Sequence, residues 1–429
     1  MSWKRTLNAS LLGAFTLAAT LNVPAQTKPS ESPALTPLLL RDLVREALDR
    51  NPEIQAARRG VESKRVRIPQ AKAWPDPMIS VGYGGNVVLP FTVMRDDPSS
   101  TRQIMAEQEI PYPGKTRLRG QIATREAEAE SMVVEEVVRR VAAEVKQSYL
   151  ELYYTDQALA TLRKDREILE KLAKVAEIRY SVGKAAQQDV LRAQVELSRL
   201  AERETLLEQT RRTLEAQLNS LRDLPVDTPV GPTGEVRPNA LVQSLEELQS
   251  AAEASFPARQ RQRTMIEGNR LAVDLARKEV KPNFSVGYTY MQRAGMPDMY
   301  GLTFSTSLPI FRRNKQGQAI REAVENLESA RRMEQNQLTV LRYRVKREYL
   351  EAQAADRLLA LYLQGIVPQS RLTLESSLAS YETGAIDFQT VLGNFTTILD
   401  YELAYHQQVA THEKALARLE ELTGLELIR

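Results

Sequence analysis

The sequence predicts a mainly α-helical protein with a small β part, in which one unit built on a long helical hairpin occurs twice. Composition is the first indication: aromatic residues make up only 6% of the chain and charged residues 26%, a mixture that favours long helices over β-sandwiches. The second is an apolar 3-4 spacing sustained through long segments, which is typical of coiled-coil packing. The third is internal repetition with a period of about 200 residues.

The N-terminus has the pattern of a secretory signal peptide. Two basic residues precede an apolar run from Leu7 to Leu21, which is shorter than the ~20 residues that a membrane-spanning helix needs. Small residues at Val23 and Ala25 predict cleavage after Ala25, so residues 1–25 form the leader. The alternative is a single membrane anchor.

Composition also excludes several kinds of function. The chain has no cysteine, which excludes disulfides, thiolate chemistry and a lipid attached to an N-terminal cysteine. The formal charge is +3, two of the basic residues lie in the leader, and the remaining charges alternate along helices. That pattern indicates solvated helix faces and gives no support to nucleic acid as a partner.

The first repeat, residues 38–222, follows an extended Pro/Ser/Thr-rich segment at 26–37. Its opening helix, to about Ala73, breaks at Pro52, because a residue before proline avoids the helical region. Proline and glycine then mark the ends of each later element. These elements are strands at 78–89 and 102–110 and a helical hairpin at 116–221 with its turn at Tyr180–Gly183.

The second repeat, residues 247–425, follows a Pro/Gly-rich linker at 223–246. Tyr180 and Gly183 match Tyr381 and Gly384 at a constant offset, so we expect the same hairpin turn. Pro368 lies inside the second hairpin and should kink its long helix. The predicted elements are a helix, strands at 283–291 and 302–310, and a helical hairpin at 317–422.

The helix lengths predict how the pieces are arranged. The outgoing helix of the first hairpin has about 65 residues, or roughly 97 Å. The returning helix and the helix before the strands have about 37 and 36 residues, or roughly 56 and 54 Å. The two shorter helices therefore match the long one when they are stacked end to end beside it.

The strands are about ten residues long, as a tilted strand needs to cross a bilayer. Four strands cannot close a barrel, and an open edge is not tolerated in lipid. Three copies supply twelve strands, so we expect a homotrimer whose barrel contacts outer-membrane lipid. The alternative is an ordinary soluble pair of hairpins that caps a helical bundle.

The junctions between strand and helix carry a family resemblance. Glu109–Lys115 (Glu-Ile-Pro-Tyr-Pro-Gly-Lys), Leu308–Phe311 (Leu-Pro-Ile-Phe) and the Tyr-x-x-Gly turns resemble the TolC family of outer-membrane efflux proteins, particularly its heavy-metal-efflux branch. The resemblance covers Leu38 to Leu425. It implies a trimer with a β-barrel in the outer membrane and a helical tunnel in the periplasm. It also implies a periplasmic adaptor and an inner-membrane pump of the RND type as partners.

The expected function is therefore a passive exit duct of a tripartite efflux pump for metal cations or small toxic compounds. One alternative is the exit duct of a type I protein-secretion system. Another, from a different class, is a soluble periplasmic coiled-coil scaffold. We find no catalytic constellation and no phosphate loop, so we predict no enzyme activity and no cofactor.

Histidine and methionine are the residues that invite a metal site. His406 and His412 lie six apart on one helix and do not share a face, so we expect simple surface histidines. Met291, Met296 and Met299 cluster in one loop, and thioethers suit Cu(I). Flexible loop packing explains them as well, and we assign no metal site.

The hairpin turns are the candidate functional residues. In the family such turns touch the adaptor, which makes Val182, Gly183, Thr383 and Gly384 the candidate docking tips. A tight turn between helices needs glycine in any case.

The resemblance also points to gate candidates near the tips: Tyr180, Asp189, Tyr381 and Asp387. Asp189 matches the family's tip aspartate that holds the pore closed, although an acid is also favourable in the first turn of any helix. The second copy has Thr390 and Gly393 where some members carry pore-ring aspartates, which leaves Asp387 as the nearest acid.

Overall fold

The computed structural model describes residues 38–85 and 99–428. These belong to one compact unit, Pro37–Arg429. The predicted leader 1–25, its cleavage site and the extended segment 26–37 lie outside the described residues, as does the end of the predicted strand 78–89. Among residues 38–85 and 99–428, none of the helices contains an apolar stretch of the length needed to span a bilayer.

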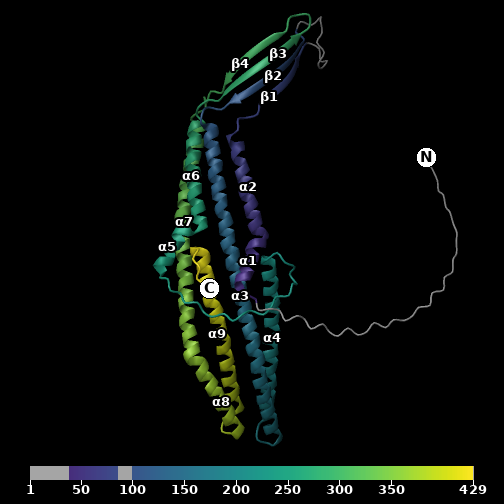
Figure 1. Cartoon of the computed structure of the whole chain (residues 1–429), viewed down its shortest axis with the longest axis vertical. Coiled ribbons are helices and arrows are strands. Elements are labelled where there is room, and N and C mark those ends of the chain that lie inside the picture. Colours follow the sequence, from purple (N-terminus) through teal and green to yellow (C-terminus); the bar gives the residue numbers. More distant parts are fainter. Residues whose placement is uncertain (1–37, 86–98, 429) are drawn as a thin grey trace, which may run out of the picture. The chain divides into compact units, whose positions relative to one another are not determined.

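The prediction of long helices with a small sheet is confirmed (Figure 1). The elements of the first repeat are α1 (Leu40–Arg50), α2 (Pro52–Lys72), β1 (Met78–Gly84), β2 (Thr101–Ile110), α3 (Lys115–Ser181) and α4 (Gln187–Leu221). Those of the second are α5 (Leu245–Ser255), α6 (Pro257–Lys278), β3 (Phe284–Arg293), β4 (Met299–Thr306), α7 (Gln316–Leu361), a π-helical turn (Tyr362–Ile366), α8 (Val367–Thr383) and α9 (Phe388–Thr423).

Helix α3 is the centre of the helical packing. It contacts α1, α2 and α4 of its own repeat and α6 and α9 of the other. The predicted 3-4 spacing in this helix comprises Val134, Val138, Val141, Val145 and Leu152. The last three are fully buried and the first two are half-buried. The 3-4 spacing therefore marks the core face, as expected where apolar residues recur on one side of a helix.

Both repeats join their stacked helices in the same way. Asn51, at the break between α1 and α2, donates from Nδ2 to the carbonyl of Leu221 at the end of α4, 3.0 Å away. In the second repeat Ser255 donates from Oγ to the carbonyl of Thr423 at the end of α9, 2.6 Å away. These joints fit the stacking predicted from the helix lengths. In the first repeat the end of α4 meets the break between α1 and α2. It is therefore α2, and not the whole segment 38–73, that is stacked end to end with α4.

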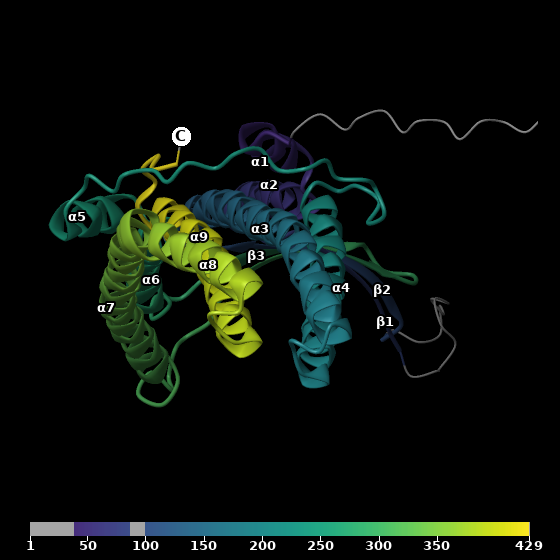
Figure 2. The same ribbon diagram turned by 90° about the horizontal axis from the view of Figure 1, so that it is seen from below.

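The linker between the repeats is tied to the helices that it crosses (Figure 2). Thr233 donates from its backbone N–H and from its hydroxyl to Asp156 of α3, and both hydrogen bonds are 3.0 Å long. The backbone N–H of Gly234 donates to the Tyr149 hydroxyl, 3.2 Å away. These bonds fix the linker against α3, although it has little regular structure of its own.

Glu413 of α9 holds the other end of the linker. It is fully buried and accepts the backbone N–H and the side-chain amide of Asn239 at 2.7 and 2.8 Å. His412 Nδ1 lies 3.1 Å from the same carboxylate. The prediction of surface histidines is wrong: His412 is 1% exposed, and burial lowers the pKa of His406. Both histidines lie where α9 packs against other elements, which helix periodicity alone does not reveal.

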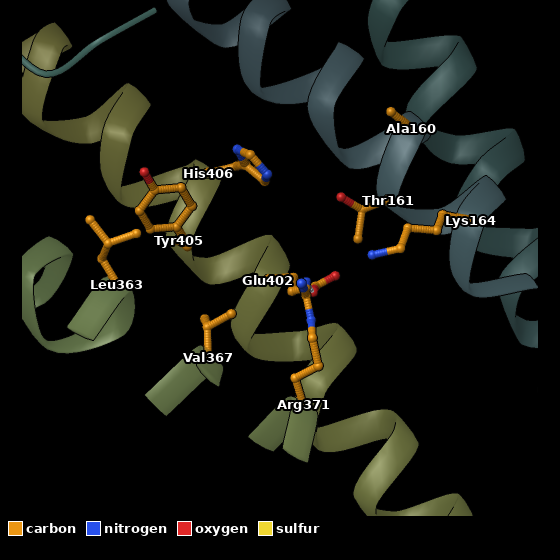
Figure 3. A pocket seen from close by; sticks show the side chains of 9 residues that line it. All are labelled: Ala160, Thr161, Lys164, Leu363, Val367, Arg371, Glu402, Tyr405 and His406. Atoms are coloured by element: carbon orange, nitrogen blue, oxygen red, sulfur yellow. Dashed lines mark hydrogen bonds and ion pairs between the residues drawn. The ribbon is translucent and has the colours of Figure 1, made fainter. Parts of the chain in front are cut away.

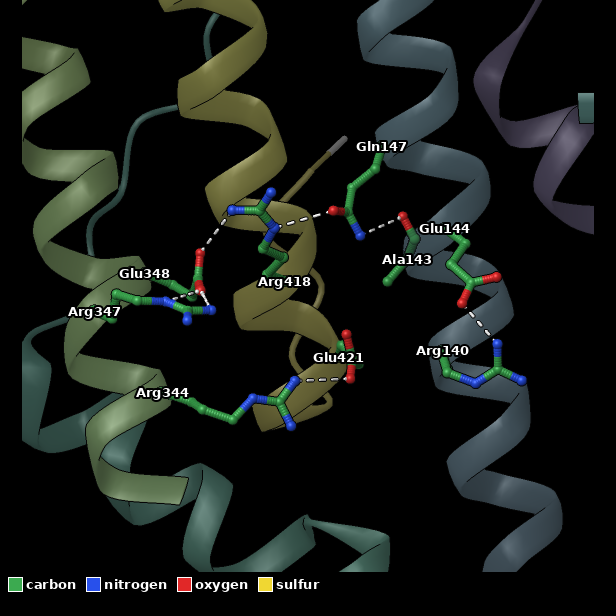
Figure 4. Close-up of polar contacts among 9 residues, drawn as sticks. All are labelled: Arg140, Ala143, Glu144, Gln147, Arg344, Arg347, Glu348, Arg418 and Glu421. Carbon is green, nitrogen blue, oxygen red and sulfur yellow. Dashed lines mark hydrogen bonds and ion pairs between the residues drawn. The ribbon is translucent and has the colours of Figure 1, made fainter. Parts of the chain in front are cut away.

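Charged bridges hold α3, α7 and α9 together at mid-height (Figure 4). Arg418 of α9 donates to Glu348 of α7 at 3.2 Å and to Gln147 of α3 at 3.0 Å. Arg344 and Glu421 are paired at 3.2 Å. Glu348 is 1% exposed, and a buried carboxylate needs such partners.

The predicted kink in the second hairpin is present as a π-helical turn. The helix changes register over Tyr362–Ile366, and Val367 donates its N–H to the carbonyl of Tyr362. Pro368 has no N–H and cannot continue the α-helical ladder. Helices α7 and α8 therefore run in different directions (Figure 1).

The four strands form one antiparallel sheet in the order β1-β2-β3-β4. The central pair, β2 and β3, joins the two repeats, with Ile110 opposite Phe284. The predicted strand 302–310 is wrong in its limits: β4 spans Met299–Thr306. It begins earlier because the turn after β3 is short, with Gly295 at φ 69°. It ends before Pro309, which has no N–H to donate to a neighbour.

Candidate functional site

The two hairpin turns close in the same way. Gly183 and Gly384 adopt positive φ angles of 71° and 85°. Lys184 N–H donates to the Arg179 carbonyl at 2.8 Å, and Ala385 N–H to the Ser380 carbonyl at 2.9 Å. These bonds satisfy carbonyls at the helix ends, so the turn alone accounts for both glycines.

The candidate docking tips are accessible. Val182 is 61% exposed, and Gly183, Thr383 and Gly384 are also exposed. An apolar side chain held at a helix tip is available to another protein, but docking itself stays a prediction.

The two equivalent tyrosines behave differently. Tyr180 is 46% exposed, whereas Tyr381 is 3% exposed. Tyr381 packs on Phe388 with ring centroids 5.7 Å apart, and the guanidinium of Arg179 lies 4.7 Å from the Tyr381 ring centroid. Burial, followed by the nearby charge of Asp189, raises the pKa of Tyr381. The two matching residues of the duplication therefore lie in different environments.

Arginines of the first hairpin reach across to the second, and the pattern of residues along the chain does not reveal these contacts. Arg179 donates to the backbone carbonyl of Tyr381, and Arg192 donates to Gln389 Oε1 at 2.7 Å. Further from the tips, Arg203 and Asp400 lie 3.2 Å apart. The one available signal was the contrast between copies, since Arg179 corresponds to Ser380 in the second turn.

The two candidate gate aspartates lie at helix starts. Asp189 is in the first turn of α4. Asp387 is the N-cap of α9 and accepts the Thr390 N–H at 2.8 Å. The hydrogen bonds from Thr390 hold the pKa of Asp387 below its usual value. Capping thus explains Asp387, and a gating role for either aspartate stays a prediction.

The sheet has two chemically different faces. Cross-strand partners share a face and neighbours along a strand alternate. One face is apolar and exposed, with Ile79 at 72%, Leu302 at 81% and Phe304 at 67%. Its other apolar members are Val81, Tyr83, Ile104, Ala106, Ile110, Phe284, Val286, Tyr288, Tyr290 and Tyr300, and four polar residues share this face near its ends: Arg102, Gln108, Gln292 and Thr306. The opposite face carries mainly Gly, Ser, Thr, Gln and Glu.

The methionines of the sheet lie on its polar face. Met291 is directly opposite Met299 in the ladder, and Met296 lies in the turn between them, 44% exposed. Within the described ranges, no group of three His, Cys, Asp or Glu side chains could hold a metal ion.

The two junctions between strand and long helix also differ. Lys115, at the start of α3, is 2% exposed. It donates to the Lys281 carbonyl and to Asn283 Oδ1, and both hydrogen bonds are 2.8 Å long. At the start of α7 the corresponding Lys315 is exposed. So are the three large apolar side chains before it: Leu308 at 70%, Ile310 at 77% and Phe311 at 70%.

Known proteins share long helical hairpins attached to a small sheet with this chain. The sequence model of the outer membrane efflux protein family matches residues 43–222. No curated protein matches the chain.

Solved structures show the fold. A membrane protein from Pseudomonas aeruginosa is 18% identical, with a TM-score of 0.77 over 94% of this chain and 99% of that one. The outer membrane protein VceC from Vibrio cholerae is 16% identical, with a TM-score of 0.75 over 90% of this chain and 96% of that one. CusC, described as forming a transmembrane channel, is 13% identical, with a TM-score of 0.77 over 94% and 96%.

Proposed function

We propose that this chain is one subunit of a trimeric outer-membrane exit duct in a tripartite efflux pump. One observation carries the proposal: a sheet that has an exposed apolar face, a polar face and, among the described residues, β1 and β4 as its edge strands is attached to long helical hairpins. The match of residues 43–222 to the outer membrane efflux protein family supports it. So does the fold shared with channel proteins.

The sheet is suited to lipid on one side and water on the other. A run of large side chains such as Leu302 and Phe304, more than half exposed, is unfavourable in water. A soluble periplasmic scaffold would not be expected to present it. The opposite face, on which most side chains are polar or absent, would line an aqueous passage.

Three copies complete the sheet. Within the described residues β1 and β4 are edge strands, and unpaired backbone groups are not tolerated in lipid. Pairing β4 of one copy with β1 of the next closes a twelve-stranded barrel. A neighbouring copy would also cover the exposed Leu308, Ile310 and Phe311.

The hairpin tips would contact a periplasmic adaptor, and through it an inner-membrane pump of the RND type. Val182 and Thr383 are the exposed side chains that are best placed for this. The duct is passive, with metal cations or small toxic compounds as cargo. Resistance assays in a strain without its own exit duct would compare metal salts, dyes and a secreted protein as cargo.

A pair of adjacent substitutions tests the membrane role. Leu302 points to the apolar face and Thr303 to the polar face. Leu302→Lys should cost about 2–4 kcal/mol per subunit if its site faces lipid, whereas Thr303→Lys should be tolerated in the lumen. The measurement is the yield of trimers in the outer-membrane fraction and their conductance in planar bilayers. Equal yields for the two variants, or a water-soluble monomer for the unaltered chain, would refute the proposal.

A further inference from the structure

A groove runs between α3 and α8, with α9 as its floor. Two cavities lie along it, of about 350 Å³ and about 480 Å³. Figure 3 shows the first, with Lys164 of α3 on one side and Arg371 of α8 and Glu402 of α9 on the other. The second continues towards the tips and is lined by Asp165 and Tyr381.

Asp165 is buried in this groove without full hydrogen bonding. It is 4% exposed, and its Oδ2 has no hydrogen-bond partner among the described residues. Burial, and then the charge of Glu402, raises the pKa of Asp165 to about 6. An unsatisfied buried carboxylate is costly, so this arrangement of helices favours the protonated acid.

The nearby cations Lys164 and Arg371 act to lower the pKa of Asp165 but do not offset its burial and the charge of Glu402. Arg371 is already paired with Glu402, and Lys164 is exposed. The ionisable groups that line the two cavities are Lys164 and Lys171 from α3, Arg371, Glu375, Tyr381 and Glu382 from α8, and Glu402, Tyr405 and His406 from α9.

Helix α8 connects this groove to the hairpin tips. Its upper end follows the π-helical turn Tyr362–Ile366, where backbone pairing changes register. Its lower end carries Tyr381, on which Arg179 of α3 is seated. A shift of α8 relative to α3 would therefore change the contact between the two tips.

We propose that Asp165 is a proton-controlled latch between the two hairpins. Protonated, it permits the arrangement seen here, with Arg371 on Glu402 and Arg179 on Tyr381. Ionised, it competes with Glu402 for Arg371, draws α8 towards α3 about the π-helical turn and disrupts the contact between the tips. The latch rests on the proposed function in one respect: in an exit duct it would make opening of the entrance depend on acidity.

The direction of the effect follows from linkage. A carboxyl whose pKa is raised from 3.8 to about 6 favours this arrangement fully below pH 3.8. The preference is lost as the pH rises through about 6. The equilibrium between the two arrangements should change by about a hundredfold across that window.

Distance measurements between spin labels test the latch in the purified full chain. The sequence has no cysteine, so Ser181→Cys with Thr383→Cys places a label on each exposed tip without background and without removing a charge from the groove. Electron paramagnetic resonance should show a second distance population that grows as the pH rises from 3.5 to 7, with its midpoint inside the window from 3.8 to about 6. This readout involves no transport, so it can fail or succeed independently of the efflux role.

Substitutions assign the titrating group. Asp165→Asn should keep the acidic distance distribution at every pH. Glu402→Gln should move the midpoint to lower pH, because Arg371 becomes available to Asp165. Asp189→Asn and His406→Gln are the matched controls and should leave the midpoint unchanged. An invariant distribution in the unaltered protein, a normal transition in Asp165→Asn, or its loss in either control would overturn the proposal.

Discussion

Replacing Lys115 by Met should loosen the junction between the sheet and the long helix. Its buried ammonium group lies 2.9 Å from Glu279 and donates to the Lys281 carbonyl and to Asn283. These partners lie at the end of α6 and the start of β3, so one side chain joins the two repeats. Met keeps the length and the apolar stem but removes the charge and every hydrogen bond.

The expected cost is about 2–4 kcal/mol in the free energy of unfolding. Breaking a fully buried pair costs about 3–5 kcal/mol. The expected cost extends below that range because Glu279 is 37% exposed and keeps Arg119 at 2.9 Å. The Asn283 amide also keeps its bond to Glu109.

The duplication supplies the control. Lys315 stands at the corresponding start of α7 and is exposed, so Lys315→Met should change the free energy of unfolding by less than about 0.5 kcal/mol. The assay is guanidinium-induced unfolding in detergent, followed by far-ultraviolet circular dichroism. Equal effects of the two substitutions, or none for Lys115→Met, would refute this account of the junction.

Three further outcomes are expected. Gly384→Ala should destabilise more than Gly183→Ala in the same unfolding assay: both incur about 1–2 kcal/mol of left-handed strain, but only at Gly384 would the new Cβ lie 3.0 Å from Arg179. Glu413→Ala should cost about 2–4 kcal/mol, because two linker N–H groups lose their acceptor, and an unchanged melting temperature would contradict this. Burial would raise the pKa of Glu279, but its partners Lys115 and Arg119 outweigh burial and hold this pKa below 4.5. The stability that Glu279 contributes to the folded state is therefore present above pH 4.5 and is lost as the pH falls through the lowered pKa. Lys115→Met should weaken that acid sensitivity, as unfolding at pH 6 and pH 3.5 would show.

Prediction from the sequence succeeded where the signal is local. The break at Pro52, the kink near Pro368 and the glycines of both turns follow from backbone chemistry within a few residues. The buried seam of α3 follows from spacing along one helix. The limits of β4 were wrong because the turn before it, and not the strand's own composition, decides where pairing starts.

The sequence by itself determined the duplication, the long hairpins and the presence of short strands, because periodicity, proline and glycine act along the chain. Only the tertiary structure decided how the two copies differ. Tyr381 is covered while Tyr180 is exposed, Lys115 is enclosed while Lys315 is not, and Asp165 is sealed in a groove. The physical reason is that α3 packs against helices of both repeats, so burial and charge at these positions depend on neighbours from the other half of the chain.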